Sequence, residues 1–494
     1  MALAPRLRSA AVLLGLIAPL AAVGHAGAQT PPLPTAEGAQ ALEAQLRGWL
    51  ARQVGPALDT GPLPLRVVVD GDNYRLEVPF GGSFFNDMLT LADGAVSATV
   101  KPLDGGRWAI VNAGIPSRIR ADMRHAGAPT SLLLGIEKHE TSGVFDPSLA
   151  TASTLNTVIT GYSTEMPTPA GVQASHFYKL SGRSDWQPTG PGRVTLTGHS
   201  TVEKYSSASP LPDGGAMQVS IERMGGTTRL ENVDLEGVGS VLRTAFTLAA
   251  ASQPVPTGET RKSPKPDEKA IARELLGQVF GLLDAVAAEY TYDGVKIEGG
   301  SPLSGSLRHA SLGFALAAPG GRSEVKLRLA LEGLDSPMIP DGVWRDYLPQ
   351  RVALSPRVAG IPKEALMGFL RRAIDTDGDS FGSEAVQLLA TGPLVLAIDD
   401  LLIDLGPLRL KGEGTVKVAS LDDATGEAEL RATGIDAMIR RANTTRELKM
   451  AAPALIFLKG IGRQDGTETV WKITYIDRKV MVNDTDLSDM MPSK

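Results

Sequence analysis

Most of the chain alternates apolar and polar residues in short runs, which is the period of half-buried β-strands. Short turn-forming segments such as Asp70-Gly71-Asp72 separate neighbouring runs, and this favours antiparallel hairpins over βαβ crossovers. Each predicted sheet therefore has one apolar and one polar face. The predicted strands are 65–69, 74–78, 95–101, 107–112, 117–123, 131–137, 176–182, 193–204, 216–223, 228–235, 291–297, 306–316, 323–332, 393–398, 401–404, 407–418, 426–432, 470–476 and 479–483.

Fewer segments carry the apolar stripe of an amphipathic helix. The first, 39–54, repeats Leu42, Leu46 and Leu50 at every fourth position and ends before Gly55-Pro56. Together the two periods predict an α+β protein, made mainly of antiparallel, twisted β-sheets with a few amphipathic helices packed on the apolar faces. The other predicted helices are 268–289, 362–374 and 435–442, with shorter ones at 242–251, 384–390 and 453–459.

The helix predicted at 268–289 has a wider apolar stripe than its neighbouring strands need. Ordinary core packing against the inner face of a curved sheet is one interpretation. The other is an apolar cleft between helix and sheet, in which a ligand gains affinity from the apolar area removed from water.

Residues 252–267 contain four prolines and no apolar periodicity, so they predict a linker. On this interpretation an N-terminal half, 29–251, precedes a C-terminal half, 268–494. The alternative is a long loop within one domain.

The first 28 residues have the three-part pattern of a secretory signal peptide. Arg6 and Arg8 precede an apolar run over 10–24, and small residues follow at Ala26 and Ala28. The run of 15 residues is shorter than the roughly 20 that cross a bilayer. We therefore expect cleavage after Ala28, a periplasmic or secreted product, and no transmembrane anchor after cleavage.

Composition narrows the possible functions. The absence of cysteine excludes disulfides, thiol chemistry and acylation at a lipoprotein cysteine. A formal net charge of −6 disfavours sequence-independent binding of nucleic acid, which needs a basic surface.

The candidate chemistry is sparse. Asp375, Asp377 and Asp379 alternate in a polar turn, as in the first part of a calcium loop, but Val386 stands where an EF-hand needs a glutamate. The choice is between a loose calcium site and a solvated loop between helices, and the second is favoured.

Other short motifs fit turns better than sites. Asp59-Thr60-Gly61 has no second copy with which to form an aspartic-protease pair, and Ser301 and Ser304 are turn serines. The five histidines after residue 28 lack the spacing of zinc ligands, and Gly412 and Gly414 indicate a bulge or bend in a strand. We expect no cofactor and no catalytic constellation.

The C-terminal third has a recurring order of strands. PLVLAIDDLLIDLGPLRLKGEGTVKV (393–418) leads to GEAELRATGIDAMIRRA (426–442) and closes with WKITYIDRKVMVNDTDL (471–487), after the helix phrase AGIPKEALMGFLRRA (359–373). This order resembles the bacterial AsmA-like cell-envelope proteins and related alphaproteobacterial periplasmic families of unknown function. The resemblance implies a twisted, β-rich envelope protein with a groove for lipid acyl chains, and no catalytic residues. The chain is smaller than the long bridge-type members and lacks their retained membrane anchor.

Three functional hypotheses remain. The first is a non-enzymatic periplasmic protein that binds lipid or another apolar ligand in a groove of a curved sheet. The second is a structural or interaction module for envelope or outer-membrane proteins, without a small ligand. The third is a hydrolase whose site has no recognisable motif.

Overall fold

The structure, a computed structural model, divides into two compact units. The first contains residues 1–214 and 227–284, and the second contains 215–226 and 285–494. The predicted signal peptide and the proline-rich segment 252–267 lie outside the described residues. Those described are 34–54, 65–84, 89–125, 128–146, 149, 151–211, 215–241, 244, 268–299, 304–318, 321–337, 342, 345–375, 387–388, 391–420, 423–476 and 479–488.

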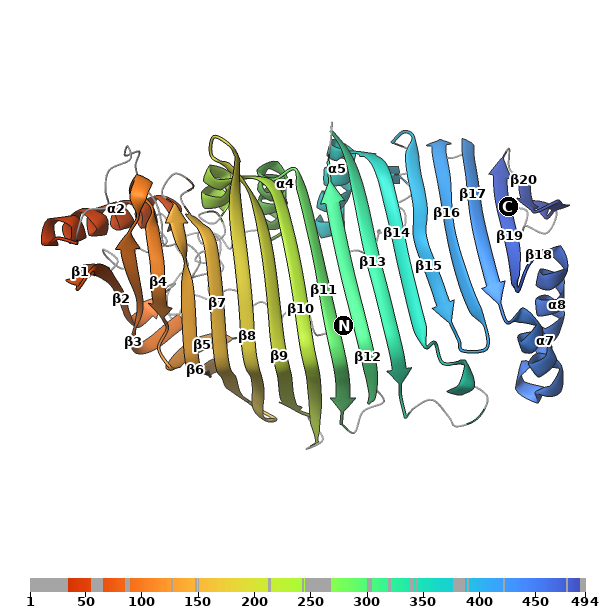
Figure 1. Ribbon diagram of the computed structural model, residues 1–494, viewed down its shortest axis with the longest axis horizontal. Coiled ribbons are helices and arrows are strands. Elements are labelled where there is room, and N and C mark those ends of the chain that lie inside the picture. The colour runs from red at the N-terminus through yellow and green to blue at the C-terminus, as the bar shows by residue number, and fades with distance from the viewer. Residues whose placement is uncertain are drawn as a thin grey trace. The chain divides into compact units, whose positions relative to one another are not determined.

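The first unit is a series of antiparallel strands accompanied by the helices α2 and α4 (Figure 1). Its strands pair mostly with their sequence neighbours, and β3 pairs with both β4 and β5. The elements are α2 (Ala36–Val54), β1 (Arg66–Asp70), β2 (Asn73–Phe84), β3 (Leu89–Pro102), η2 (Asp104–Gly106), β4 (Trp108–Gly114), β5 (Arg118–His125), β6 (Ala128–Asp146), β7 (Thr151–Thr168), β8 (Gly171–Gly190), β9 (Arg193–Pro210), the second part of β10 (Ala216–Asp234), and α4 (Glu268–Leu282).

The second unit is also antiparallel, and each strand from β11 to β17 pairs with the next before β17 pairs with β19. The first part of β10 belongs to it. Its other elements are β11 (Ala285–Glu298), β12 (Gly305–Ala317), β13 (Arg322–Asp335), η4 (Arg345–Tyr347), β14 (Arg351–Pro362), α5 (Lys363–Asp375), β15 (Leu394–Asp404), β16 (Arg409–Ser420), β17 (Asp423–Thr433), α7 (Ile435–Thr444), η5 (Arg446–Ala451), α8 (Ala452–Ile461), β18 (Arg463–Asp465), β19 (Glu468–Ile476), β20 (Lys479–Val482) and β21 (Thr485–Asp486).

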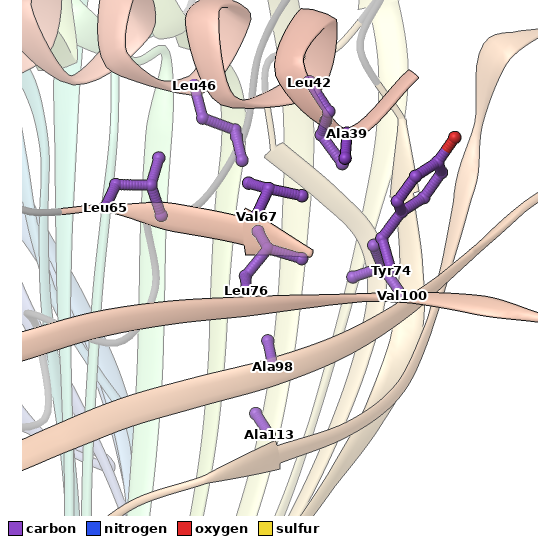
Figure 2. Packing of buried hydrophobic residues seen from close by; sticks show 10 residues of the cluster. All are labelled: Ala39, Leu42, Leu46, Leu65, Val67, Tyr74, Leu76, Ala98, Val100 and Ala113. Atoms are coloured by element: carbon purple, nitrogen blue, oxygen red, sulfur yellow. The ribbon is translucent and has the colours of Figure 1, made fainter. Parts of the chain in front are cut away.

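The mainly antiparallel, β-rich class predicted from the alternating pattern is therefore confirmed in both units. The helix predicted at 39–54 is confirmed as α2, and its apolar stripe packs on the strands that follow it (Figure 2). Leu42 and Leu46 contact a core that includes Val67 and Leu76. Glu43 accepts a hydrogen bond from the Val67 backbone N–H at 3.1 Å, which fixes the helix against the edge of β1.

Several expectations about local structure were wrong. The strand β7 was not predicted, because its many threonine and serine residues weaken the alternation of apolar and polar positions. The helix predicted over 268–289 ends at Leu282, and residues 285–289 begin β11. The reason is that Val286, Ala288 and Tyr290 satisfy a period of two as well as a helical period, and pairing with β12 selects the strand.

The strand β14 was not predicted, because its Pro356 and Gly360 are typical of turns. Gly360 has φ +88°, and the register of β14 against β15 shifts between Leu354 and Pro356. Leu354 and Pro356 are two positions apart, whereas their partners Leu401 and Ile398 are three apart, so the extra residue is in β15. This bulge of β15 accommodates the proline inside the sheet, and it joins the predicted strands 393–398 and 401–404 into one strand.

Three of the remaining predicted helices are confirmed, and two lie mostly outside the described residues. Those at 362–374, 435–442 and 453–459 are confirmed as α5, α7 and α8, whereas most of 242–251 and 384–390 lies outside the described residues. No helix in the described part of the chain is long and apolar enough to span a membrane.

Substitution of Leu42 by alanine tests the packing of α2. The side chain is 7% exposed, so its truncation leaves a cavity, and we expect the free energy of unfolding to fall by about 2–5 kcal/mol. Urea denaturation measures this. Val68→Ala in β1 is the control, because Val68 is 49% exposed and its loss changes stability by less than about 1 kcal/mol. Equal losses in the two variants would contradict the packing described.

Candidate functional site

The main candidate site is one face of the strands β11 to β15 in the second unit. Tyr290 of β11 pairs directly with Leu312 of β12, and Leu312 pairs with Leu329 of β13. Directly paired residues lie on the same face of an antiparallel sheet, as do residues two apart along a strand. We call this the apolar face; its most exposed members are Tyr290, Leu312, Phe314, Leu327, Leu329, Leu331 and Ile398.

These seven large apolar side chains are exposed to solvent. Each is between 39% and 45% exposed. The six on β11, β12 and β13 occupy neighbouring positions on adjacent strands, whereas Ile398 of β15 is separated from them by β14, where it pairs with Pro356. Single exposed leucines are ordinary, but contiguous rows of them mark a surface that contacts another apolar body. In the described part of the chain, the rows are not packed away as a core.

The opposite face of the same strands is charged and is satisfied by its own ion pairs. Arg351 lies 3.0 Å from Glu332, and Lys326 lies 2.8 Å from Glu324. Long side chains of this kind cover the small residues between them. Ala353, on this face, is only 7% exposed. The strands are therefore amphipathic. One face exposes apolar side chains, and the other is covered by ion-paired polar side chains.

The bulge in β15 keeps the apolar face continuous. Ile398 and Leu401 are three positions apart and would lie on opposite faces of a regular strand, but they pair with Gly414 and Gly412 on one face of β16. The bulge lies in β15, opposite these glycines, and β16 pairs with β17 without a register shift at Gly412 or Gly414, so the bulge predicted in their own strand is not found there. A Cβ on Gly412 would overlap the side chain of Leu430, so glycine allows the close approach of β17.

A second feature of this unit is a polar cleft of about 590 Å³, lined by Arg308, Arg345 and Arg441 among others. Its guanidinium groups are already engaged. Arg308 lies 3.4 Å from Glu332, Arg345 lies 2.9 Å from Asp335, and Arg441 stacks 5.1 Å from the ring centroid of Tyr347. The cleft is therefore a weaker candidate for ligand binding than the apolar face.

The predicted calcium loop is only partly described. Asp375 is the exposed last residue of α5, and Asp377 and Asp379 lie outside the described residues. No group of three or more possible metal ligands occurs among the residues that the structure describes. The calcium site stays a prediction, as does the interpretation of Asp59-Thr60-Gly61 and Ser301, which also lie outside them.

The histidines and Ser304, the other candidate functional residues, do not form a common site. They lie on separate strands or contact only nearby residues. The five histidines stand on five different strands: His125 on β5, His139 on β6, His176 on β8, His199 on β9 and His309 on β12. Nδ1 of His309 lies 2.6 Å from Asp293. The Ser304 hydroxyl donates to the Gly299 carbonyl at 2.6 Å, as a turn serine does.

His139 has a shifted protonation equilibrium. Its Nε2 lies 2.9 Å from the Thr141 hydroxyl, and burial lowers the pKa of the imidazole from its usual value of 6.5. The folded protein therefore favours the neutral ring of His139.

Comparisons of the chain with protein-family models, with curated proteins and with solved structures found no match. The resemblance to AsmA-like envelope proteins accordingly stays a prediction.

The shift at His139 predicts how stability depends on pH. Because the folded-state pKa is lowered, the unfolded chain takes up a proton first as the pH falls below about 7, and the folded state loses stability. We expect His139→Gln to reduce the loss of unfolding free energy between about pH 7.5 and pH 5, measured by urea denaturation at each pH. Parallel losses in variant and wild type would show that the ring titrates equally in both states.

Proposed function

We propose that this chain is an exported, non-enzymatic protein of the bacterial cell envelope that binds lipid acyl chains or another apolar ligand on the apolar face of β11 to β15. The observation that carries the proposal is the set of contiguous rows of large apolar side chains that are two-fifths exposed. Export is supported by the signal-peptide pattern of residues 1–28.

The chemistry of the apolar face fits a long apolar molecule. Strands are spaced by about 4.8 Å, so five adjacent strands offer a strip about 20 Å long across the rows, which suits an extended acyl chain. Removing about 200 Å² of apolar surface from water contributes on the order of 5 kcal/mol before the cost of association. Burial of this kind is non-directional, so it selects a class of ligand by shape and hydrophobicity.

The charged face supports binding of an apolar ligand on the apolar face and not on the opposite one. Two of its arginines are held in cross-strand ion pairs, Arg351 with Glu332 and Arg357 with Asp399, each at 3.0 Å. A ligand that is apolar along its length therefore gains nothing on that face. A partner protein with an apolar surface is the alternative occupant of the apolar face, and the experiment below separates the two.

Two substitutions on the apolar face test the proposal. Leu312→Gln together with Leu329→Gln introduces polar groups at two directly paired positions. We expect the purified wild-type protein to release lipid on extraction with organic solvent, detected by mass spectrometry. The double variant should carry little, and its affinity for a fluorescent fatty acid should fall about tenfold or more.

The control is Val111→Gln with Val172→Gln in the first unit, where both valines are more than half exposed and neither belongs to the apolar face. This variant should bind the fatty acid as the wild type does, and circular dichroism should show equal strand content in all three proteins. A wild type that yields no lipid and shows no saturable fatty-acid binding contradicts the proposal; a reproducible envelope protein in its place favours the interaction module.

A further inference from the structure

The segment 435–461, comprising α7, η5 and α8, lies between β17 and β18 of the second unit; we call it the helical appendage (Figure 1). Specific bonds fix it to the sheet. Trp471 of β19 donates its indole N–H to the Leu458 carbonyl at 2.8 Å, and the Asn483 amide donates to the Ile461 carbonyl at 2.8 Å. These donors satisfy carbonyls of the last turn of α8, which the helix itself leaves unpaired.

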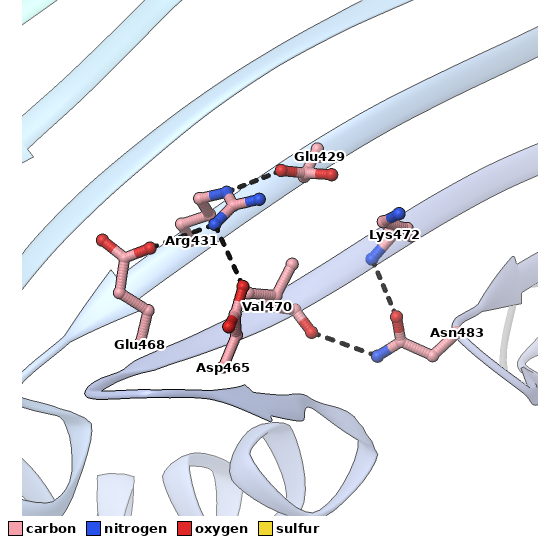
Figure 3. A network of polar contacts seen from close by, with 7 residues as sticks. All are labelled: Glu429, Arg431, Asp465, Glu468, Val470, Lys472 and Asn483. Carbon is pink, nitrogen blue, oxygen red and sulfur yellow. Dashed lines mark hydrogen bonds and ion pairs between the residues drawn. The ribbon is translucent and has the colours of Figure 1, made fainter.

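Asn483 also ties this anchor to the strands. Its side chain accepts from the Lys472 backbone N–H at 3.0 Å and donates to the Val470 carbonyl at 3.1 Å (Figure 3). On the next strand, Arg431 of β17 lies 2.6 Å from Glu429 and 3.2 Å from Glu468 (Figure 3). The Trp471 and Asn483 side chains therefore hold the end of α8 against β19 and the turn after β20, and the Arg431 contacts hold β17 to β19 beside them.

The inner side of the appendage is packed. Ala442, Leu448 and Ala452 are at most 7% exposed and form one cluster with Tyr347 and Leu455. The helical appendage therefore already has a buried side, formed by residues of α7, η5 and α8.

The exposed residues of α8 are apolar, which reverses the usual arrangement of a surface helix. Ile456, Phe457 and Leu458 are 52%, 43% and 44% exposed, and Met450, just before α8, is 94% exposed. A surface helix ordinarily carries charged residues at such positions.

The charged residues of the appendage indicate what kind of partner its exposed apolar residues contact. The helical appendage, residues 435–461, contains five basic and two acidic side chains, in a chain whose net charge is −6. Arg440, Arg446 and Lys449 are exposed in the same segment as the apolar residues. Apolar side chains bordered by lysine and arginine are the pattern of helices that lie in the interface of an anionic membrane.

A second copy of the chain fits this surface less well. In a two-fold contact between two appendages, both surfaces would carry the same excess of basic side chains. Like charges that meet across an interface oppose association, whereas anionic lipid headgroups attract these basic side chains.

We propose that the helical appendage docks on the surface of an anionic lipid bilayer, with Met450, Ile456, Phe457 and Leu458 entering the headgroup region and Arg446 and Lys449 contacting the headgroups. This proposal is separate from ligand binding on the apolar face, since it concerns other residues and a bilayer surface.

Vesicle flotation with the purified full chain tests the proposal. We expect the protein to float with vesicles that contain phosphatidylglycerol, to remain behind with phosphatidylcholine vesicles, and to dissociate as salt is raised. Arg446→Glu with Lys449→Glu should weaken partitioning by roughly thirtyfold or more, because each basic residue near an anionic surface contributes to binding. Ile456→Gln with Phe457→Gln should weaken it by roughly tenfold.

Matched controls lie elsewhere on the chain. Lys101→Glu reverses an exposed charge in β3, and Val172→Gln removes an exposed apolar side chain from β8; both should float as the wild type does. Leu312→Gln with Leu329→Gln should also float normally, which separates this proposal from the one on the apolar face.

A second measurement does not depend on loss of binding. The chain has no cysteine, so Ile456→Cys gives a single attachment point for a polarity-sensitive fluorophore. Its emission should shift to the blue with phosphatidylglycerol vesicles, and the same fluorophore on Val172→Cys should not respond. Equal flotation with both lipids, unchanged partitioning of the appendage variants, or a dimer that dissociates in Ile456→Gln with Phe457→Gln would overturn the proposal.

Discussion

The antiparallel register of β11 to β15 determines which side chains share each face of this part of the sheet. Because Tyr290, Leu312 and Leu329 pair directly, one face of the sheet collects large apolar side chains and the other collects charges. A slip of one residue in any strand would place its leucines among the arginines and glutamates of the opposite face. Fixing the register therefore produces the surface on which the proposed binding takes place.

The bulge of β15 makes that surface continuous where the sequence alone would interrupt it. The extra residue between Ile398 and Leu401 restores the side on which the apolar residues lie, and the bulge is opposite Pro356 of β14. Proline disfavours a regular strand, so local chemistry and long-range pairing agree at this point.

Much of this could be predicted from the sequence, and the failures have physical causes. The alternating runs at 306–316 and 323–332 indicate strands with one apolar face, and that inference was right. The expectation that helices pack on the apolar faces follows from the usual need to bury such faces; α2 does so over Val67 and Leu76. Pattern alone cannot show which apolar rows stay open, because the exposure of Leu312 or Leu329 depends on residues distant in sequence. Likewise, the outward position of Phe457 is set by the anchor at Trp471 and Asn483, which no local periodicity encodes.

The most direct test of the central claim is to locate a bound acyl chain. A fatty acid with a photoreactive group on its tail, bound to the purified protein and irradiated, forms covalent adducts that peptide mass spectrometry can map. The account predicts adducts on β11 to β15, concentrated at positions such as Leu312 and Leu329, and competition by unlabelled fatty acid. Adducts confined to other strands, or spread over the chain without competition, would contradict it.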